Sequence, residues 1–185
     1  METDTSFFTN EPGNTLKDRF STLVRGTALF DCLVGYFYSS GFHAIYPALE
    51  NTENIRILIG ISTSGDTLKI IEEGNKSIQH EITFSHSETK EIIEGAIQHE
   101  MEHSQDSSSV ETGVHKFIEW IRSGKLKVKA YPSKNIHAKL YIMTFKEGSI
   151  DKGRVITGSS NFTKSGLEDN LEFNVELKNS GDYRF

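Results

Sequence analysis

The chain has 185 residues, of which 36% are apolar and 25% charged, and its net charge is −6. This composition predicts one globular domain of ordinary size, spanning residues 1–185. Because Cys32 is the only cysteine, an internal disulfide is excluded, and we expect a reducing, cytoplasmic compartment. The sequence has neither a signal-peptide pattern nor an apolar run long enough to span a bilayer, so we expect no membrane partner.

The first third of the chain predicts a helix followed by a strand–helix–strand unit. Residues 15–25 place apolar side chains at helical spacing, with a polar cap at Asn14 or Thr15. Nearly continuous apolar runs predict two buried strands, and a short helix is predicted between them, giving Phe30–Tyr38, Gly41–Leu49 and Ile55–Ile61. Two buried strands separated by a helix favour a parallel pair.

The remainder predicts further helices and then four short strands. We predict helices over 67–73, 88–102 and 114–122, and a mobile loop over Gln105–Thr112. The predicted strands are Leu126–Tyr131, Ile136–Phe145, Arg154–Thr157 and Asn170–Leu177. The sum is an α/β fold with a mixed sheet and helices packed on it.

Charge is distributed unevenly along the chain. From Glu81 to Glu119 there are nine acidic and two basic residues, whereas from Arg122 to Lys139 there are six basic and no acidic residues. The overall acidity argues against a generic nucleic-acid-binding protein. The basic run nevertheless provides a local positive field for a phosphate-bearing substrate, and we assign Lys134 within it to substrate binding. Charge runs of this kind are also common on solvated surfaces.

A set of polar residues follows this basic run. His137 and Lys139 lie two residues apart in a strand pattern, so we expect them on one face. The small-residue turn that follows a later strand presents backbone N–H groups, a hydroxyl and a carboxamide to an anion, at Gly158, Ser159, Ser160 and Asn161. Glu172 is predicted on the next strand. Each of these residues taken alone is more often structural than catalytic.

Together these groups suit phosphodiester chemistry without dedicated metal ligands or a cofactor. The imidazole of His137 is a nucleophile for phosphorus. Lys139 and Asn161 are suited to hold the non-bridging oxygens, and the carboxylate of Glu172 to orient the imidazole. Gly158, Ser159 and Ser160 are predicted to bind the substrate.

The spacing resembles the phospholipase D superfamily, whose motif combines His-x-Lys with a later Gly-Ser/Gly-x-Asn turn. The resemblance rests on His137, Lys139, Gly158, Ser159 and Asn161. Glu172, eleven positions beyond the asparagine, is similar to the acidic residue of the bacterial nuclease branch. The motif's aspartate position is occupied by Thr144, which leaves open whether the site is active. The resemblance implies a phospholipase-D-like mixed sheet flanked by helices, as an α-β-α sandwich.

The segments before the motif extend the resemblance. Residues 7–16, 30–42 and 55–60 look like the start of phospholipase-D-like domains attached to the amino terminus of bacterial DEAD-box-like or Swi/Snf-like helicases. This likeness implies that the chain is an N-terminal fragment of a longer protein with helicase domains, and that its substrate is DNA.

Only half of the expected catalytic machinery is present in the sequence. The superfamily uses two His-x-Lys sets, one histidine as nucleophile and the other as general acid. None of the other six histidines is followed by lysine two residues later. Single-motif relatives complete the site across a two-fold dimer, and an isologous interface brings the same residue of each subunit together. We therefore expect a homodimer in which two copies of His137 meet.

A competing motif occurs at residues 99–103, where His99, Glu100 and His103 fit the zinc-protease pattern H-E-x-x-H. The segment runs into a polar serine-rich stretch and no third ligand is evident, so adventitious metal binding is the stronger interpretation of the two histidines.

The choice of substrate rests on the absence of an interfacial helix with exposed Trp or Leu, and on the basic run that leads to the motif. We therefore expect a metal-independent phosphodiesterase acting on DNA. The alternative is a non-catalytic DNA-binding and dimerisation module of a helicase-like or restriction protein.

Overall fold

The computed structural model describes residues 5–63, 107–130 and 137–178. In chain order its elements are β1 (Thr5–Thr9), α1 (Leu16–Leu23), the 3₁₀ helix η1 (Val24–Gly26), β2 (Thr27–Phe37), α2 (Ser39–Leu49), β3 (Asn54–Thr63), α5 (Ser107–Arg122), β4 (Leu126–Ala130), β5 (Lys139–Phe145), β6 (Gly153–Gly158), the π-helical turn η2 (Ser165–Asp169) and β7 (Phe173–Leu177).

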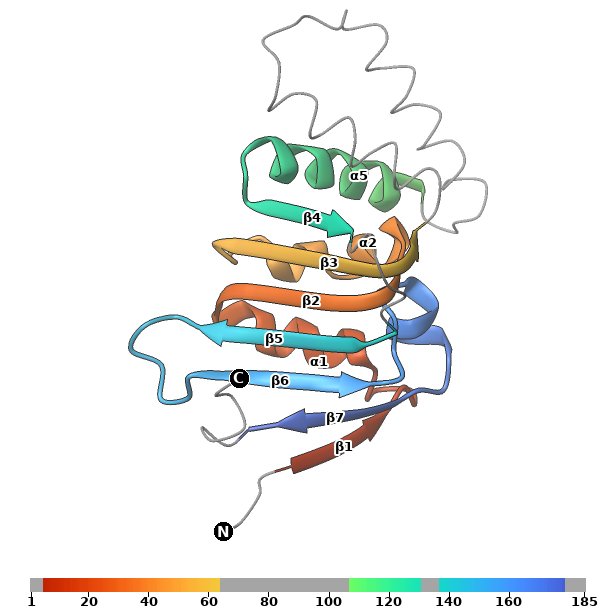
Figure 1. Ribbon diagram of the computed structural model, residues 1–185, viewed down its shortest axis with the longest axis vertical. Helices are drawn as coiled ribbons and strands as arrows, with labels where there is room; N and C mark the ends of the chain where they lie inside the picture. Colours follow the sequence, from red (N-terminus) through yellow and green to blue (C-terminus); the bar gives the residue numbers. More distant parts are fainter. Residues whose placement is uncertain (1–4, 64–106, 131–136, 179–185) are drawn as a thin grey trace, which may run out of the picture.

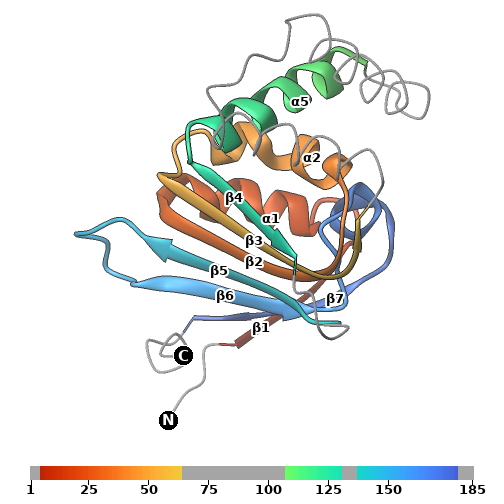
Figure 2. The same cartoon turned by 45° about the horizontal axis from the view of Figure 1, so that its top comes forward.

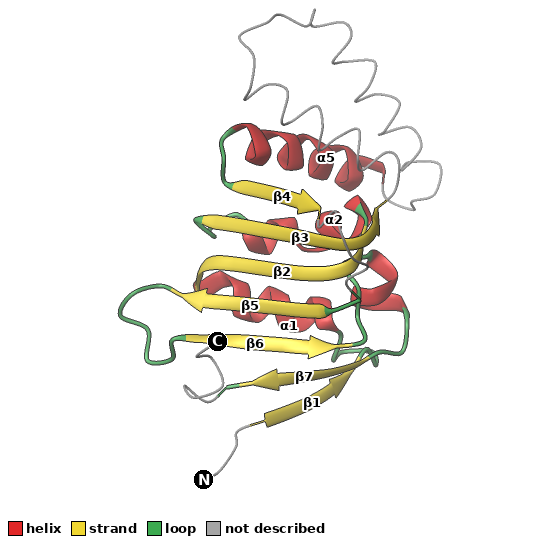
Figure 3. Cartoon of the chain, viewed as in Figure 1, coloured by secondary structure: helices red, strands yellow, loops and turns green. Residues whose placement is uncertain are grey.

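The strands form one mixed sheet in the order β1-β7-β6-β5-β2-β3-β4 (Figures 1 and 3). β2, β3 and β4 are parallel to one another, and α2 connects the first two in the predicted strand–helix–strand unit. The other half of the sheet is antiparallel throughout, from β2–β5 to β7–β1. β2 is therefore the boundary strand, with a parallel neighbour on one side and an antiparallel neighbour on the other.

The three described α-helices pack on the same face of the sheet (Figure 2). α1 begins with a capping box, in which the Thr15 hydroxyl accepts from the Asp18 N–H and the Asp18 carboxylate accepts from the Thr15 N–H. α5 ends before Gly124, whose φ of 77° suits a glycine at a helix C-terminus. None of the described helices is long and apolar enough to cross a bilayer.

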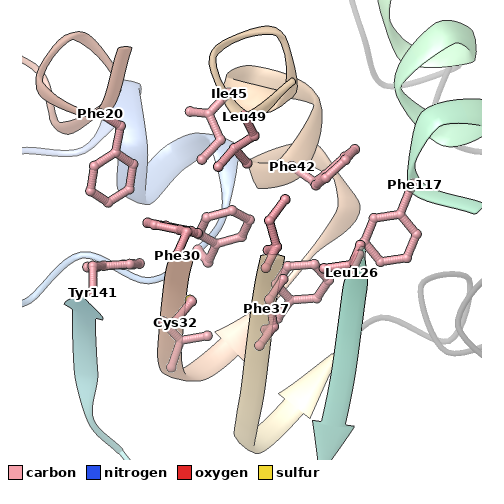
Figure 4. Close-up of a cluster of buried hydrophobic side chains, with 14 of the residues drawn as sticks. Phe20, Phe30, Cys32, Phe37, Phe42, Ile45, Leu49, Phe117, Leu126 and Tyr141 are labelled. Atoms are coloured by element: carbon pink, nitrogen blue, oxygen red, sulfur yellow. The ribbon is translucent and has the colours of Figure 1, made fainter. Parts of the chain in front are cut away.

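Aromatic side chains fill the space between the helices and the sheet (Figure 4). Phe30 and Phe37 of β2 are fully buried, as are Phe20 of α1, Phe42 of α2 and Tyr141 of β5. Phe20 contacts Tyr141 edge-on, with ring centroids 4.9 Å apart. Perpendicular ring pairs of this kind add a modest stabilisation to the burial of apolar area. The core therefore fixes β2 and β5 relative to the helices.

The antiparallel half of the sheet carries a buried carboxylate. Glu176 of β7 is 1% exposed. It accepts hydrogen bonds from Arg19 Nε at 2.5 Å and from Arg154 Nε at 3.1 Å. The hydrogen bond to Glu176 also raises the pKa of Arg19. This ion network joins α1 to the antiparallel half of the sheet.

The sequence predictions agree with the structure in the central elements. The two apolar runs form β2 and β3, the helices at 15–25 and 41–49 are present as α1 and α2, and the later strands form β4 to β7. A mixed sheet flanked by helices is confirmed. The predicted helices at 67–73 and 88–102 lie outside the described residues.

Three predictions were wrong at element ends, and one strand was missed. Residues 107–112 belong to α5 rather than to a loop. β1 was not predicted, because its five residues form a strand only by pairing with β7. β5 begins at Lys139 and β7 at Phe173, so His137 and Glu172 each precede a strand rather than lying within one.

The ion network predicts a large loss of stability on Glu176→Gln, which keeps the shape of the side chain but leaves two arginines without their buried countercharge. We expect a loss of about 3 kcal/mol of unfolding free energy, measured by urea denaturation. Asp151→Asn is the matched control, because this half-exposed carboxylate contacts Arg154 at the surface, and it should cost less than about 1 kcal/mol. Equal effects of the two substitutions would contradict this account.

Candidate active site

Four strands meet at one edge of the sheet, at the right of Figure 1. β2 and β6 run towards this edge and end there, whereas β5 and β7 begin there, because each is antiparallel to its neighbour. Phe37, the last residue of β2, forms an isolated parallel bridge with Phe162. The residues before β5, after β6 and before β7 are therefore brought together, although more than thirty positions separate the first from the last.

His137 and Lys139 are in contact at this edge. The Lys139 Nζ lies 3.0 Å from His137 Nε2 and 3.3 Å from His137 Nδ1. Lys139 is buried, with 8% of its surface exposed, whereas His137 is exposed. The expectation that the two side chains lie together is met. They are not held by strand alternation, because His137 lies in irregular chain before β5.

The end of β2 joins the two halves of the motif. The register of β2 against β3 shifts between Val34 and Tyr36, where Gly35 of β2 lies opposite two residues of β3, so the extra residue belongs to β3. The Gly35 N–H donates to the Ala138 carbonyl at 3.0 Å, and the Tyr36 N–H donates to Asn161 Oδ1 at 3.2 Å. Asn161, predicted to hold a phosphate oxygen, thus also ties its turn to β2.

The turn after β6 is held by β7. The Ser159 N–H donates to the Phe173 carbonyl at 2.9 Å, and the Phe173 N–H donates to Ser159 Oγ at 3.0 Å. Gly158 is needed here because a Cβ at this position would lie 2.1 Å from the Phe173 carbonyl oxygen. This exchange holds Ser159 and Gly158 at the edge, where both are exposed.

Ser160 requires a correction. We predicted a substrate-binding residue, but Ser160 is fully buried. Its Oγ accepts from Asn174 Nδ2 at 3.0 Å, and its carbonyl accepts from the Tyr141 hydroxyl at 2.8 Å. Burial raises the pKa of Tyr141 well above its usual value, so the hydroxyl remains a donor. Ser160 therefore anchors the turn to the core instead of facing a ligand.

Glu172 lies beside the turn. Its carboxylate accepts a hydrogen bond from Ser159 Oγ, whereas we expected it to orient the imidazole. Thr144, at the aspartate position of the motif, pairs with Gly153 near the other end of β5. Five residues of extended strand separate it from Lys139, which is about 17 Å. The missing aspartate is therefore remote from His137.

The basic run divides into residues with different roles. Lys125 Nζ donates to the carbonyls of Leu49 and Glu50 and lies 3.8 Å from the ring centroid of Trp120, and burial lowers the pKa of Lys125. Lys125 therefore caps the carboxyl end of α2. Lys127 and Lys129 are exposed on β4, whose carboxyl end is at the same edge as the motif. Lys134 lies outside the described residues.

The competing histidine motif at residues 99–103 also lies outside the described residues. Within the described part of the chain, no group of three or more His, Cys, Asp or Glu side chains is arranged to hold a metal ion. Sequence reasoning missed Tyr36, whose ring centroid lies 6.2 Å from that of His137 at an interplanar angle of 88°. The signal available in the sequence was the Gly35–Tyr36 pair, in which a glycine and a tyrosine with its polar hydroxyl interrupt an apolar run.

A protein-family model described as the PLD-like domain of cardiolipin synthase matches residues 39–183. No curated protein sequence matches the chain. Solved structures that resemble it include yeast tyrosyl-DNA phosphodiesterase, with 15% identity and a TM-score of 0.48 over 93% of this chain and 31% of that one. The chain thus spans about a third of that enzyme's length.

Two smaller solved proteins are covered over most of their length. NucT from Helicobacter pylori has 11% identity and a TM-score of 0.48, over 98% of this chain and 89% of that chain. Nuc from Salmonella typhimurium, described as a phospholipase D family member, has 14% identity and a TM-score of 0.43, over 96% and 84%.

The contact between Gly158 and Phe173 predicts that Gly158→Ala destabilises the turn. The added Cβ overlaps backbone of β7, and we expect a loss of roughly 2 kcal/mol in thermal denaturation. Gly26→Ala is the matched control, because no atom lies within 4 Å of a Cβ at that position, and it should leave the melting temperature unchanged or slightly raised. A Gly158→Ala protein as stable as the control would show that the turn is not packed as described.

Proposed function

Because the chain belongs to the family of PLD-like domains, we propose that it is a metal-independent phosphodiesterase that cleaves DNA through a phosphohistidine intermediate. The observation that carries this proposal is the contact between the His137 imidazole and the Lys139 ammonium at the edge that also holds Ser159, Asn161 and Glu172. These residues come from three separate parts of the chain, and such a gathering of nucleophile, cation and hydrogen-bond donors is the arrangement that phosphoryl transfer requires.

The proposed reaction has two displacements at phosphorus. In the first, a nitrogen of His137 forms a bond to phosphorus and the bond to the leaving oxygen breaks. The leaving oxygen takes a proton from a second imidazole. In the second, that imidazole removes a proton from water, the water oxygen attacks phosphorus, and the bond to His137 breaks. The products are a phosphomonoester, a free hydroxyl and both histidines in their starting states.

Lys139 supports the first displacement. An ammonium only donates hydrogen bonds, and a neutral imidazole has one ring nitrogen with a free lone pair, so Lys139 donates to only one of the two nitrogens that it lies near. Attack on phosphorus uses this same lone pair, so in the proposed reaction the Lys139 hydrogen bond passes from the imidazole to the phosphate before the attack. The remaining N–H groups of Lys139 are available to a non-bridging phosphate oxygen, and its burial strengthens that electrostatic interaction. The Nδ2 group of the Asn161 amide supplies a further donor, whereas the Ser159 N–H is already bound to the Phe173 carbonyl.

DNA is favoured over a lipid by the surface around the site. Lys127 and Lys129 are exposed along β4, and the strand leads towards the edge that holds His137. Such lysines follow a phosphate backbone without reading base sequence. Trp120, the residue best suited to insert into a lipid interface, is 4% exposed and packs in the core. From the resemblance of its first strands, we further propose that helicase domains accompany this domain in the full-length protein.

The second imidazole is proposed to be His137 of a second copy. The chain has one His-x-Lys set, and its His137 lies exposed at the sheet edge, where a two-fold axis would bring two such residues together. The functional unit is therefore a homodimer with one composite site.

His137→Ala should abolish cleavage of labelled DNA in EDTA, with a loss of at least about 10³-fold, because no nucleophile remains. His115→Ala, which removes an exposed imidazole from α5, is the control and should cut at the wild-type rate.

Vesicles of phosphatidylglycerol serve as the competing substrate that tests the choice of DNA over a lipid. DNA binding without cutting by the wild-type protein would favour the non-catalytic module, and cleavage of the lipid alone would overturn the choice of DNA.

The composite site predicts that inactive subunits suppress active ones. When wild-type chains are refolded with a threefold excess of His137→Ala chains, random pairing leaves roughly a quarter of the wild-type chains in wild-type dimers. Activity should therefore fall to about that fraction, whereas an excess of His115→Ala should not lower it. Activity that stays proportional to the wild-type chains added, or a monomer in light scattering, would contradict the shared site.

A further inference from the structure

We propose that Tyr36 is a positioning residue that holds the His137 imidazole ready for attack on phosphorus. The two rings lie perpendicular, with centroids 6.2 Å apart. This is the edge-to-face geometry that aromatic pairs prefer. The proposal rests on the proposed function of His137 as the nucleophile, and it gives a role to a residue outside the His-x-Lys and Gly-Ser-x-Asn motifs.

The imidazole needs support because of where it lies. His137 is exposed and precedes β5, so no ladder of the sheet fixes its backbone on its own account. Its other side-chain contact, Lys139 Nζ, is at the end of a long flexible chain. A rigid ring on a central strand restricts the imidazole in a way that a lysine cannot, since tyrosine has only two side-chain torsions to fix.

Tyr36 is itself fixed by both halves of the site. At the end of β2, the Gly35 N–H donates to the carbonyl of Ala138, which lies between His137 and Lys139. The next residue donates its own N–H to Asn161 Oδ1. Tyr36 thus lies between the chain that carries the nucleophile and the turn that is proposed to bind phosphate. A shift of β2 would therefore move Tyr36, the segment that carries His137 and the turn at Asn161 together.

The expected consequence is on the chemical step. An imidazole held near its attacking orientation loses less freedom on reaching the transition state. Tyr36 acts through His137, so its loss should lower kcat and leave KM nearly unchanged. The ring is what matters, so phenylalanine should replace tyrosine, whereas leucine should not.

The test compares Tyr36→Leu and Tyr36→Phe by steady-state DNA cleavage and by NMR of the imidazole Cε1–H groups. We expect Tyr36→Leu to lower kcat about three- to tenfold, the size of effect that an aromatic pair supplies. Tyr36→Phe should stay within about twofold of wild type. In the NMR spectrum, the His137 signal, assigned by its loss in His137→Ala, should lose its ring-current shift in Tyr36→Leu and keep it in Tyr36→Phe.

Tyr38→Leu is the control for a general effect of removing a tyrosine at the end of β2. Tyr38 is 38% exposed and lies two residues further along the chain. It should change neither kcat nor the His137 signal. An unchanged kcat and an unchanged His137 signal in Tyr36→Leu would overturn the inference, as would equal effects of Phe and Leu. If the wild-type protein cuts no DNA, the proposed function fails, and the NMR comparison still tests the ring contact by itself.

Discussion

The pairing of β2 with β5 is the constraint on which the rest of the structure depends. β2 has a parallel neighbour on one side and antiparallel β5 on the other. This reversal brings the start of β5 to the edge where β2 ends. If β5 ran parallel to β2, His137 and Lys139 would lie at the opposite end of the sheet from the Gly158–Asn161 turn.

Buried side chains of the core stabilise the pairing of β2 with β5. Phe30 and Phe37 of β2 and Tyr141 of β5 are completely buried, and Tyr141 also donates to the carbonyl of Ser160. The same tyrosine therefore packs β5 against α1 and anchors the turn after β6. A buried hydrogen bond of this kind fixes geometry, because breaking it would leave a polar group unpaired in the interior. The exposed end of the site is built on this rigid base.

Much of the architecture could be predicted from the sequence because its central strands carry long apolar runs whose buried residues face the helices. Phe30–Tyr38 and Ile55–Ile61 are nearly continuous apolar runs, and runs of this length are typical of buried strands. The edge strand β1 and the start of α5 were harder to predict. β1 exists through its pairing with β7, and the start of α5 is rich in serine, which also favours loops. Local patterns carry no information about such tertiary pairing.

The candidate site was predictable as a set of residues but not in its connections. The motif spacing located His137, Lys139, Ser159 and Asn161. It did not reveal that Ser160 is buried, that Glu172 binds Ser159, or that the end of β2 places Tyr36 against the imidazole. These features depend on strands that are far apart in sequence, so they appear only when the sheet is assembled.

The central claim is that His137 forms a covalent bond to phosphorus during DNA cleavage. The most direct test is to mix the protein with DNA in EDTA, quench within the first turnover under alkaline denaturing conditions, and map the peptides by mass spectrometry. The account predicts a nucleotidyl phosphoramidate on His137, absent from the His137→Ala protein. Cleavage at the wild-type rate with His137 unmodified, or with the adduct on another residue, would contradict it.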